Sequence, residues 1–539
     1  MTTKKLDEMS SKFFDFDGKG KAEVLPSRAD FLDEIGKAAV QSGATAMAVP
    51  PLYLQIPYTQ PHLLYPAFSG RGGILFESAN LTQKKETNSF IVFEPYAFLR
   101  AKDGQVEMEC GGKRALSAKK DPLSRLKDSV HAYRQKANPG LPPFQGGAAG
   151  LICYDYARHL ENIPPKKDDL LLPDICFVMA DRLLAFDHAL KKAWLVFCPG
   201  ARQSGLGYGD ISGLDWAGVY DDSVREMARI FKKLQKEIEK ISPDATHGAA
   251  PRGGREAAVS HEMTEEEYVS IVARAKEYIA AGDIFQANLS LRLSAGLGGA
   301  APWEIYLSLR DINPSPFAAF MEFGDFFVAG SSPERLVKLK DGLVETRPIA
   351  GTRPRGKDGG EDCALRAELL LNEKEKAEHI MLVDLERNDI GKVAEWGSVE
   401  VDELMTTEDY SHVMHIVSNV KGRLAAGKDM FDCLRAAFPG GTITGVPKVR
   451  CMEIINELEP VRRGAYTGSA GYFGFSGAMD MNIMIRTFLI KNDTAYMQAG
   501  AGIVADSNPE REYRESLKKA EALLLALKTS MERVNSDII

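Results

Sequence analysis

The chain has 539 residues, of which 44% are hydrophobic and 26% charged, and its formal net charge is −8. This length allows two or three domains with a large core, and the acidic balance argues against a nucleic-acid partner. The sequence contains no run of about 18 apolar residues, so we expect no membrane span. The start of the chain has no apolar signal-peptide core and the seven cysteines form no CxxC pair, so we expect a cytoplasmic globular protein with reduced thiols.

In residues 1–240, short apolar runs alternate with Gly, Pro and Asp turns. The runs at residues 90–93 and 193–197 are examples of predicted strands, and helices are expected mainly at residues 28–41 and 222–240. This pattern favours an antiparallel-rich sheet with few helices.

Residues 241–262 (ISPDATHGAAPRGGREAAVSHE) are rich in Gly, Pro, Ala and Ser and lie between two strongly patterned regions. Such composition predicts an exposed linker or a long surface loop. We therefore divide the chain into residues 1–240, this linker, and residues 263–539.

After the linker, Thr264 and Glu267 form a capping-box pattern that predicts the start of a helix, followed by a strand at residues 284–293. Further helices are expected at about 363–386, 447–459 and 509–532, and further strands at 325–330, 343–349, 465–475, 481–490 and 494–499. The predicted fold class is α+β, with two packed antiparallel-rich sheets and helices outside.

Two glycine-rich segments, residues 440–448 (GGTITGVPK) and 499–503 (AGAGI), can present backbone N–H groups to a ligand without obstruction by side chains. Pro447 is placed to open a helix, whose N-terminal end would add positive potential. The pattern predicts a site for a small anion.

Carboxylates recur at helical spacing in two segments. Glu375 and Glu378 share a helix face, and Glu512, Glu515 and Lys519 share another. Carboxylates from two helices that meet at one site suit Mg²⁺, which binds few protein oxygens and keeps waters for its substrate. A solvated charged stripe is the alternative interpretation.

Three other residues have two interpretations each. Arg486 lies in an apolar run, where a guanidinium needs a carboxylate partner, either from a ligand or from the protein. His415, on a predicted helix or strand, and Tyr466, between glycines, can be functional or can simply pack. The chain has no GxSxG, P-loop or Rossmann motif, and no Cys–His arrangement that predicts a glutaminase.

Taken together, these segments resemble the chorismate-utilising enzymes, and among them most closely the component I family of anthranilate synthases. The matching segments are residues 348–356, 375–389, 415–418, 439–448, 463–473, 498–503 and 512–520, with weaker matches at 52–57, 70–79 and 144–154. The resemblance spans roughly residues 264–525 at high specificity.

The resemblance implies a role for each matched residue. Glu378 and Glu515 are the expected Mg²⁺ ligands, the metal holding the ring carboxylate of chorismate, and Lys519 is expected to support the same carboxylate. Backbone cradles for substrate are expected at Gly351, Thr352, Gly500, Ala501 and Gly502, and Tyr466 and Arg486 are expected to bind the enolpyruvyl carboxylate. Glu334 resembles the general acid that protonates the leaving C4 hydroxyl, and His415 and Thr442 resemble the pair that assists loss of pyruvate.

Two positions favour anthranilate formation over the sibling activities. Gln286 stands where isochorismate and salicylate synthases typically have a water-activating lysine, and Ala350 stands where aminodeoxychorismate synthases usually have a lysine. The expected reaction converts chorismate and ammonia to anthranilate and pyruvate, with a separate glutamine amidotransferase supplying the ammonia. Aminodeoxychorismate synthesis is the alternative.

A regulatory element is also expected from the resemblance. Residues 74–79 (ILFESA), which include Ser78, resemble the family's tryptophan-inhibition element, and residues 313–318 (NPSPFA), which include Pro316, resemble its second half. Family members usually have Tyr and Met at the positions of Phe317 and Ala318. The same two segments also suit a core strand and a proline turn.

Overall fold

The computed structural model describes residues 23–42, 47–79, 87–204, 211, 213–241, 258–409 and 413–536. Within these ranges, no helix is both long and apolar enough to cross a membrane. Most of the predicted linker, residues 242–257, lies outside the described residues.

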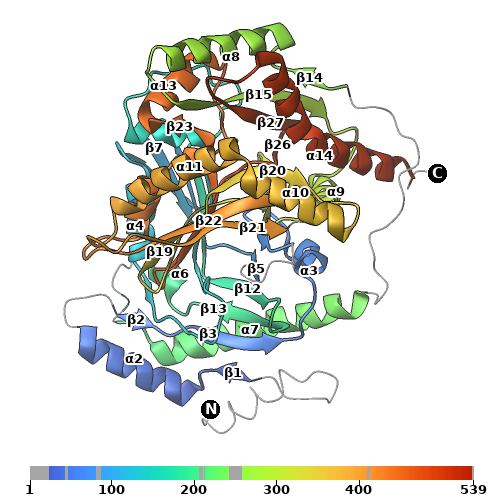
Figure 1. Cartoon of the computed structure of the whole chain (residues 1–539). Helices are drawn as coiled ribbons and strands as arrows, with labels where there is room; N and C mark the ends of the chain where they lie inside the picture. The colour runs from blue at the N-terminus through green and yellow to red at the C-terminus, as the bar shows by residue number, and fades with distance from the viewer. Residues whose placement is uncertain are drawn as a thin grey trace.

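Two large antiparallel sheets organise the described part of the chain (Figure 1). The thirteen-stranded sheet contains, in spatial order, β1 (Val24–Leu25), β3 (Leu52–Ile56), β13 (Lys192–Phe197), β12 (Arg182–Asp187), β5 (Asn88–Val92), β4 (Ile74–Glu77), β16 (Phe317–Glu322), β17 (Phe327–Ser332), β26 (Thr487–Lys491), β27 (Thr494–Ile503), β15 (Gln286–Gly296) and β14 (Ser260–His261), with β23 (Gly445–Val446) paired to β15. The twelve-stranded sheet contains β20 (Ile349–Pro354), β22 (Val413–Arg423), β19 (Leu343–Thr346), β18 (Arg335–Lys340), β25 (Met479–Asn482), β24 (Ser469–Gly474), β10 (Gly147–Ile152), β11 (Ile175–Ala180), β6 (Ala97–Lys102), β7 (Gln105–Cys110) and β8 (Lys113–Ala118), with β21 (Glu400–Asp409) paired to β22. A separate parallel pair joins β2 (Ala48–Val49) to β9 (Arg134–Gln135). Each large sheet takes strands from both sides of the predicted linker.

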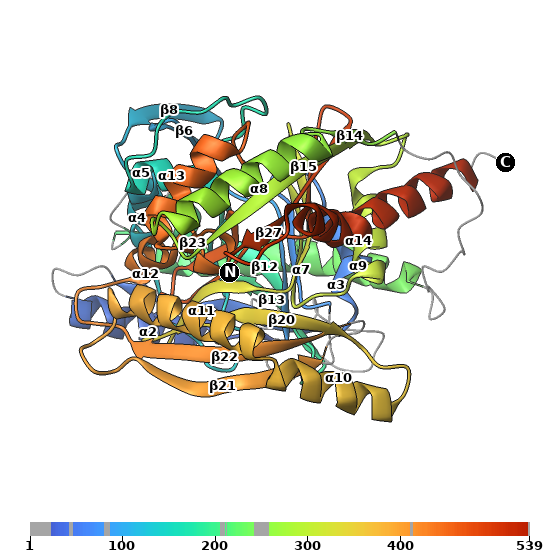
Figure 2. The ribbon, with the colours of Figure 1, turned by 45° about the horizontal axis from the view of Figure 1, so that its top comes forward.

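Helices cover the outer faces of the sheets. They are α2 (Arg28–Ser42), α3 (Pro61–Phe68), α4 (Leu123–His131), α5 (Ala157–Leu160), α6 (Ala201–Gln203), α7 (Trp216–Lys240), α8 (Glu265–Ala280), α9 (Pro302–Ile312), α10 (Gly359–Leu371), α11 (Glu373–Gly391), α12 (Met430–Ala437), α13 (Lys448–Leu458) and α14 (Pro509–Ser536), with short 3-10 turns η1 (Tyr154–Tyr156) and η3 (Gly441–Ile443). Figure 2 shows α11 alongside β20 and β22, while α8, α13 and α14 lie over β15 and β27.

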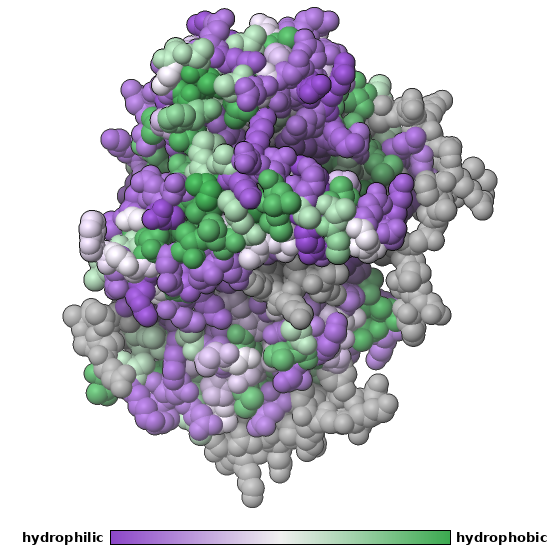
Figure 3. Space-filling model, viewed as in Figure 1, coloured by the Kyte–Doolittle hydropathy of each residue, from purple (hydrophilic) through white to green (hydrophobic). Residues whose placement is uncertain are grey.

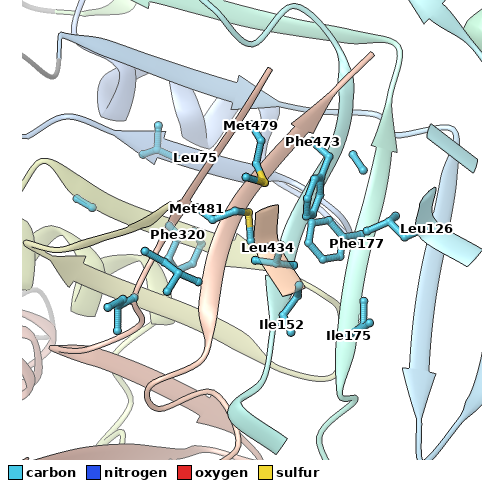
Figure 4. Packing of buried hydrophobic residues seen from close by; sticks show 14 of the residues in the cluster. Leu75, Leu126, Ile152, Ile175, Phe177, Phe320, Leu434, Phe473, Met479 and Met481 are labelled. Atoms are coloured by element: carbon cyan, nitrogen blue, oxygen red, sulfur yellow. The ribbon is translucent and has the colours of Figure 1, made fainter. Parts of the chain in front are cut away.

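The core lies between the sheets and under these helices (Figure 4). Phe177 from β11 and Phe473 from β24 have ring centroids 5.5 Å apart, and Phe431 from α12 stacks on Phe473 at 4.6 Å. Aromatic pairs at such separations contribute about 0.5–1.5 kcal/mol beyond the burial of their area. The α+β fold class with two packed sheets is therefore confirmed.

Most predicted elements are confirmed, including the capping box of α8, in which Thr264 accepts from the Glu267 N–H and Glu267 reaches back to the Thr264 N–H. The single helix predicted at 363–386 is wrong. Two helices, α10 and α11, meet at Asn372, whose side chain accepts from the Glu375 N–H and caps α11. The strand predicted at 343–349 is likewise two strands, β19 and β20.

The strand predicted at 481–490 is also wrong, because the chain bends between β25 and β26. Arg486 lies in this bend with φ of +50° and not in a strand interior. Because Arg486 belongs to neither strand, the argument that a guanidinium in a strand interior needs a carboxylate partner does not apply to it.

The face seen in Figure 1 is mixed in character. Figure 3 shows hydrophobic side chains gathered in its middle, over α10 and α11. Leu371, at the end of α10, is 71% exposed, and Ile380 of α11 is 41% exposed. Apolar side chains gathered in this way mark a face that can contact another molecule.

Candidate active site

Glu334 lies between β17 and β18 and is only 6% exposed. Its N–H donates to the hydroxyl of Ser332 at 3.3 Å, and its carbonyl accepts from the Ile483 N–H at 3.0 Å. Burial raises the pKa of the Glu334 carboxyl to about 7, although Thr442 and Arg486 act in the opposite direction. Near neutral pH this carboxyl therefore holds a proton in a large share of molecules.

The charge of Arg486 lowers the pKa of both Glu334 and His415, which indicates that its guanidinium lies near both side chains. The bend that carries Arg486 is fixed to β17 by a hydrogen bond from the Ser331 N–H to the Arg486 carbonyl, 3.0 Å long. A guanidinium held in this way can bind a carboxylate in a planar, two-bond geometry.

Thr442 lies in the 3-10 turn η3 of the glycine-rich segment. Its carbonyl accepts from the side-chain amide of Asn288 in β15 at 3.3 Å. Its hydroxyl oxygen is buried and makes no hydrogen bond of regular geometry within the described residues, although it lies close enough to Glu334 to favour the carboxylate. A Cβ on Gly441 would lie 2.1 Å from a methyl of Leu385, so glycine lets this turn approach α11.

His415 is buried on β22, which settles the choice between helix and strand. Its Nδ1 lies 2.9 Å from the Thr352 hydroxyl and 3.3 Å from the Gly351 carbonyl, both on β20. Burial lowers the pKa of His415 to about 4, and the charge of Arg486 acts in the same direction. The imidazole is therefore neutral at pH 7 and can accept a proton.

The second glycine-rich segment belongs to β27, which pairs with β15. Ala501 is buried opposite Leu289, and a Cβ on Gly500 would lie 2.3 Å from the Leu289 carbonyl. A Cβ on Gly502 would lie 2.5 Å from the side-chain nitrogen of Gln286, and that nitrogen donates to Glu378 of α11 at 3.4 Å. These contacts join β27, β15 and α11 on one side of the site.

Carboxylates from α11 and α14 face a common space. Burial and the neighbouring Glu375 raise the pKa of Glu378, and burial and Glu515 raise the pKa of Glu512. The positive charge of Lys519 in α14 opposes both pKa shifts, which indicates that its ammonium group lies near Glu378 of α11 as well as near Glu512. Lys519 also donates to Glu515 at 2.9 Å and to the Gly500 carbonyl at 3.0 Å.

This donor set fits Mg²⁺. Carboxylates crowded together, whose charged forms are disfavoured by burial and by each other, gain from a bound cation. Mg²⁺ takes few protein oxygens. The described residues contain no group of three or more His, Cys, Asp or Glu side chains placed to hold a metal ion. A Mg²⁺ ion does not need such a group, because waters and the substrate can fill its other positions.

Tyr466 lies over a buried ion pair. The guanidinium of Arg463 is 5.6 Å from the Tyr466 ring and donates two hydrogen bonds to Glu459, at 2.8 and 2.6 Å. The next residue, Thr467, donates its N–H to the Met484 carbonyl at 2.8 Å, which ties Tyr466 to the bend that carries Arg486. Burial raises the pKa of the Tyr466 hydroxyl, so it stays protonated and can donate to an anion.

The predicted inhibitor residues lie at a different place, beside a cavity of about 180 Å³ between the sheets. Pro316, Phe317 and Ala318 line this cavity. Ser78 is buried next to it, and its N–H donates to the Ser89 hydroxyl at 3.0 Å.

Sequence reasoning missed two parts of the site. The first is the ion pair of Arg463 and Glu459, whose i, i+4 spacing was the available signal. The second is the polar wall of the cavity, made of Lys338, Lys340, Asp480 and Asn482. Its signal was weak, because two polar residues that alternate along a strand usually face solvent.

Comparison with known proteins identifies the family to which the chain belongs. The family model described as chorismate binding enzyme matches residues 74–525. Aminodeoxychorismate synthase component 1 of Bacillus subtilis is 44% identical over 470 residues, which cover 86% of this chain and 94% of the relative. Anthranilate synthase component 1 of Thermus thermophilus is 45% identical over 432 residues, which cover 79% and 86%. The crystal structure of anthranilate synthase component I from Streptococcus pneumoniae superposes with a TM-score of 0.69 at 33% identity, covering 86% of this chain and 97% of that one. The chain therefore belongs to the chorismate-binding enzyme family.

Proposed function

We propose that this chain is anthranilate synthase component I, which converts chorismate and ammonia to anthranilate and pyruvate. The observation that carries the proposal is the buried Glu334, which keeps a proton near neutral pH beside a guanidinium suited to a carboxylate. Several relatives at 41–46% identity carry the name anthranilate synthase component 1 or component I-like protein.

In the first half-reaction, ammonia adds at C2 of chorismate while the C4 hydroxyl leaves as water with the proton of Glu334. Arg486 and Tyr466 bind the enolpyruvyl carboxylate and orient the ring, because one is a fixed cation and the other a protonated donor. The deprotonated Glu334 is then stabilised by Arg486 and Thr442, which favour its charged form.

In the second half-reaction, the C2 proton is removed and the bond from C3 to the enolpyruvyl oxygen breaks, which leaves an aromatic ring and the enolate of pyruvate. This enolate takes up one proton to become pyruvate. His415 is neutral and accepts this proton, and the Thr442 hydroxyl assists the departing oxygen. The Thr352 hydroxyl and the Gly351 carbonyl hold the imidazole in place.

Glu378 and Glu515 would hold a Mg²⁺ ion, and its positive charge would serve to bind and neutralise the ring carboxylate of the substrate. Lys519 adds a second positive charge on the same side and is anchored to the Gly500 carbonyl. Gly351, Gly500, Ala501 and Gly502 leave backbone groups open to the substrate.

Gln286 supports ammonia as the nucleophile. An amide cannot act as a base toward water, and its nitrogen already donates to Glu378. The alternative product, 4-amino-4-deoxychorismate, is suggested by the similarity to the Bacillus subtilis relative. Ala350 argues against it, because its methyl group supplies no amine at this position of β20.

Two partners complete the proposal. A glutamine amidotransferase supplies ammonia, and the exposed apolar side chains of α10 and α11 offer a face beside the site for it. Tryptophan binds the cavity lined by Pro316, Phe317 and Ala318, which is large enough for an aromatic amino acid, and inhibits the enzyme.

The test is to incubate the purified chain with chorismate, Mg²⁺ and an ammonium salt at alkaline pH, and to identify the product by fluorescence and chromatography. Anthranilate is expected. Accumulation of 4-amino-4-deoxychorismate would assign the alternative, and a product formed without any nitrogen source would assign isochorismate or salicylate chemistry.

A further inference from the structure

A small pocket of about 20 Å³ lies between two segments that are far apart in the sequence. One wall is formed by η1, α5 and the loop that follows them, with Tyr154, Arg158 and Lys166. The other wall is formed by α13 and the residues after it, with Glu459 and Arg462. Figure 2 shows α5 beside α13. We call this space the α13 pocket.

Hydrogen bonds between the two walls fix the shape of the α13 pocket. The Tyr154 N–H donates to the Gly464 carbonyl, and the Gly464 N–H donates to the Asp155 carboxylate, both at 2.8 Å. Farther along the same walls, the Arg462 N–H donates to the Lys167 carbonyl at 3.0 Å. These bonds belong to the chain itself, so the pocket is formed before any ligand enters it.

Three buried groups that can donate lie in this pocket without a hydrogen-bond partner among the described residues. They are the hydroxyl of Tyr154 and the Nε–H groups of Arg158 and Arg462. Tyr154 and Arg462 are only 7% and 9% exposed. The terminal nitrogens of the arginines pair with acids instead, because Arg462 lies 3.1 Å from Asp168 and 3.2 Å from Asp103, and Arg158 lies 3.6 Å from Asp103. Buried donors nearly always have an acceptor, so three together indicate one that is supplied from outside the chain.

The charges around the pocket favour an anion. Four of its described lining residues are cationic, namely Arg158, Lys166, Arg462 and Arg463. Of the two acids in the lining, Glu459 already accepts two hydrogen bonds from Arg463, at 2.8 and 2.6 Å. Burial raises the pKa of the other acid, Asp155, to about 6 and lowers the pKa of Lys166. A bound anion would favour the charged form of Lys166, which burial opposes.

We propose that the α13 pocket binds one small oxyanion through the Tyr154 hydroxyl and the Nε–H groups of Arg158 and Arg462. A guanidinium nitrogen can only donate, so the complementary ligand is an acceptor, and the surrounding cations select one with negative charge. One water needs about 10–15 Å³. A pocket of about 20 Å³ therefore takes a small ion such as sulfate, or a single carboxylate group, and excludes a larger metabolite.

The α13 pocket adjoins the proposed active site without forming part of it. The Arg463 guanidinium lies 4.8 Å from the ring centroid of Tyr154 and 5.6 Å from that of Tyr466. The pocket and the proposed substrate site therefore share one cation. The proposal uses none of the chorismate chemistry, and its test needs no substrate, so its failure would leave the proposed function untouched.

The test measures sulfate binding by the full chain at pH 6 and constant ionic strength, without chorismate or Mg²⁺. Calorimetry and thermal unfolding should both show saturable binding to the unmodified chain, which distinguishes a site from the general stabilisation that sulfate gives to proteins. Tyr154→Phe removes only the unpartnered hydroxyl. We expect its dissociation constant for sulfate to rise about tenfold or more, while its Tm without sulfate stays the same or rises, because no hydrogen bond within the chain is lost.

A second variant and a matched control complete the solution measurements. Arg158→Lys keeps the charge and removes the Nε–H, so it should weaken sulfate binding by a similar factor and serves if Tyr154→Phe fails to fold. Tyr133→Phe is the control, because Tyr133 does not line the pocket and its buried hydroxyl donates to the Pro199 carbonyl at 2.9 Å. Its Tm should fall, and its affinity for sulfate should stay the same.

A crystal soaked with selenate locates the ion directly. Its anomalous peak should lie within hydrogen-bond distance of the Tyr154 hydroxyl and of the Nε atoms of Arg158 and Arg462. The proposal is overturned if the unmodified chain shows no saturable sulfate binding, if both pocket variants bind sulfate with unchanged affinity, or if the crystal shows only a water in the pocket.

Discussion

Replacing Glu334 by glutamine removes the proton that the proposed reaction needs and keeps the size of the side chain. The structure predicts a large effect because neither the Thr442 hydroxyl nor the His415 imidazole beside Glu334 can take over the role of the acid. Thr442 carries a hydroxyl that is a much weaker acid, and the imidazole of His415 is neutral at pH 7. We expect the variant to bind chorismate and to lose most of its turnover.

The size of the effect follows from the pKa of Glu334. With an ordinary carboxyl pKa of 4.5, about 0.3% of molecules would carry the proton at pH 7, whereas a pKa of about 7 makes this share about half. Burial thus gives the enzyme roughly a hundredfold more of the active form. General acid catalysis itself contributes about 10²–10⁴-fold, so Glu334→Gln is expected to lower kcat/KM by about that factor.

The assay measures kcat/KM for chorismate from pH 6 to pH 9 at a constant concentration of free ammonia. Because the acid must be protonated, activity should be full below about pH 7 and should fall tenfold per pH unit above it. The control is Glu400→Gln, which removes an exposed carboxylate of β21 paired with Lys421. Unchanged turnover in Glu334→Gln, or the same alkaline fall in that variant, would refute the assignment of Glu334 as the acid.

The same shift has a consequence for stability with a defined sign. The folded-state pKa of Glu334 lies above the unfolded value, so the contribution of this carboxyl is fully present below about pH 4.5 and is lost as the pH rises through about 7. Burying the carboxylate above that pH costs up to about 3 kcal/mol. Glu334→Gln should therefore unfold at a higher urea concentration than the unmodified chain at pH 8, and the two should differ less at pH 5.

Three further predictions concern other residues in and around the site. Glu378→Gln should abolish the dependence of the rate on Mg²⁺ concentration together with turnover while leaving the urea midpoint nearly unchanged, and a normal Mg²⁺ titration would remove Glu378 from the metal site. Gly500→Ala should destabilise the fold, because the new Cβ lies 2.3 Å from a backbone carbonyl of β15, whereas Gly502→Ala meets only a flexible amide at 2.5 Å and should mainly reduce activity; equal losses of thermal stability would contradict this reasoning. Arg463→Met should cost about 3–5 kcal/mol in urea unfolding, because it leaves the buried Glu459 charge without its partner, and the double variant with Glu459→Leu should recover most of that loss.

Local patterns in the sequence predicted the elements well where local interactions decide them. The capping box at Thr264 and the apolar period of α8 specify that helix without reference to the rest of the fold. Asn372 carried the same kind of signal for a helix start, but the uninterrupted helical composition around it hid the boundary.

The position of Arg486 could not be predicted in this way. The residues beside it, Ile485, Thr487 and Phe488, are strand-forming, and a long-range contact fixes the bend. The bend is held to β17, which lies far earlier in the chain, by the hydrogen bond from the Ser331 N–H to the Arg486 carbonyl. Tertiary contacts override strand propensity where a sheet changes direction.

The strand pairing shows that both glycine-rich segments pack against the same residue, Gln286. Gly445 has φ of +131° and its Cβ position lies 2.1 Å from the Gln286 carbonyl, so the first segment is held against the start of β15. The second segment, through Gly502, packs on the side chain of the same Gln286. Two cradles that are about fifty residues apart in sequence are therefore joined by one residue, and that residue also bonds to Glu378. Gln286 also occupies the position that we propose separates the sibling activities, so a substitution there should act on both glycine-rich segments and on the proposed metal ligand Glu378 together. A switch from ammonia to water as the nucleophile would therefore need further substitutions in both glycine-rich segments. The single substitution Gln286→Lys should reduce ammonia-dependent turnover without making water an efficient nucleophile.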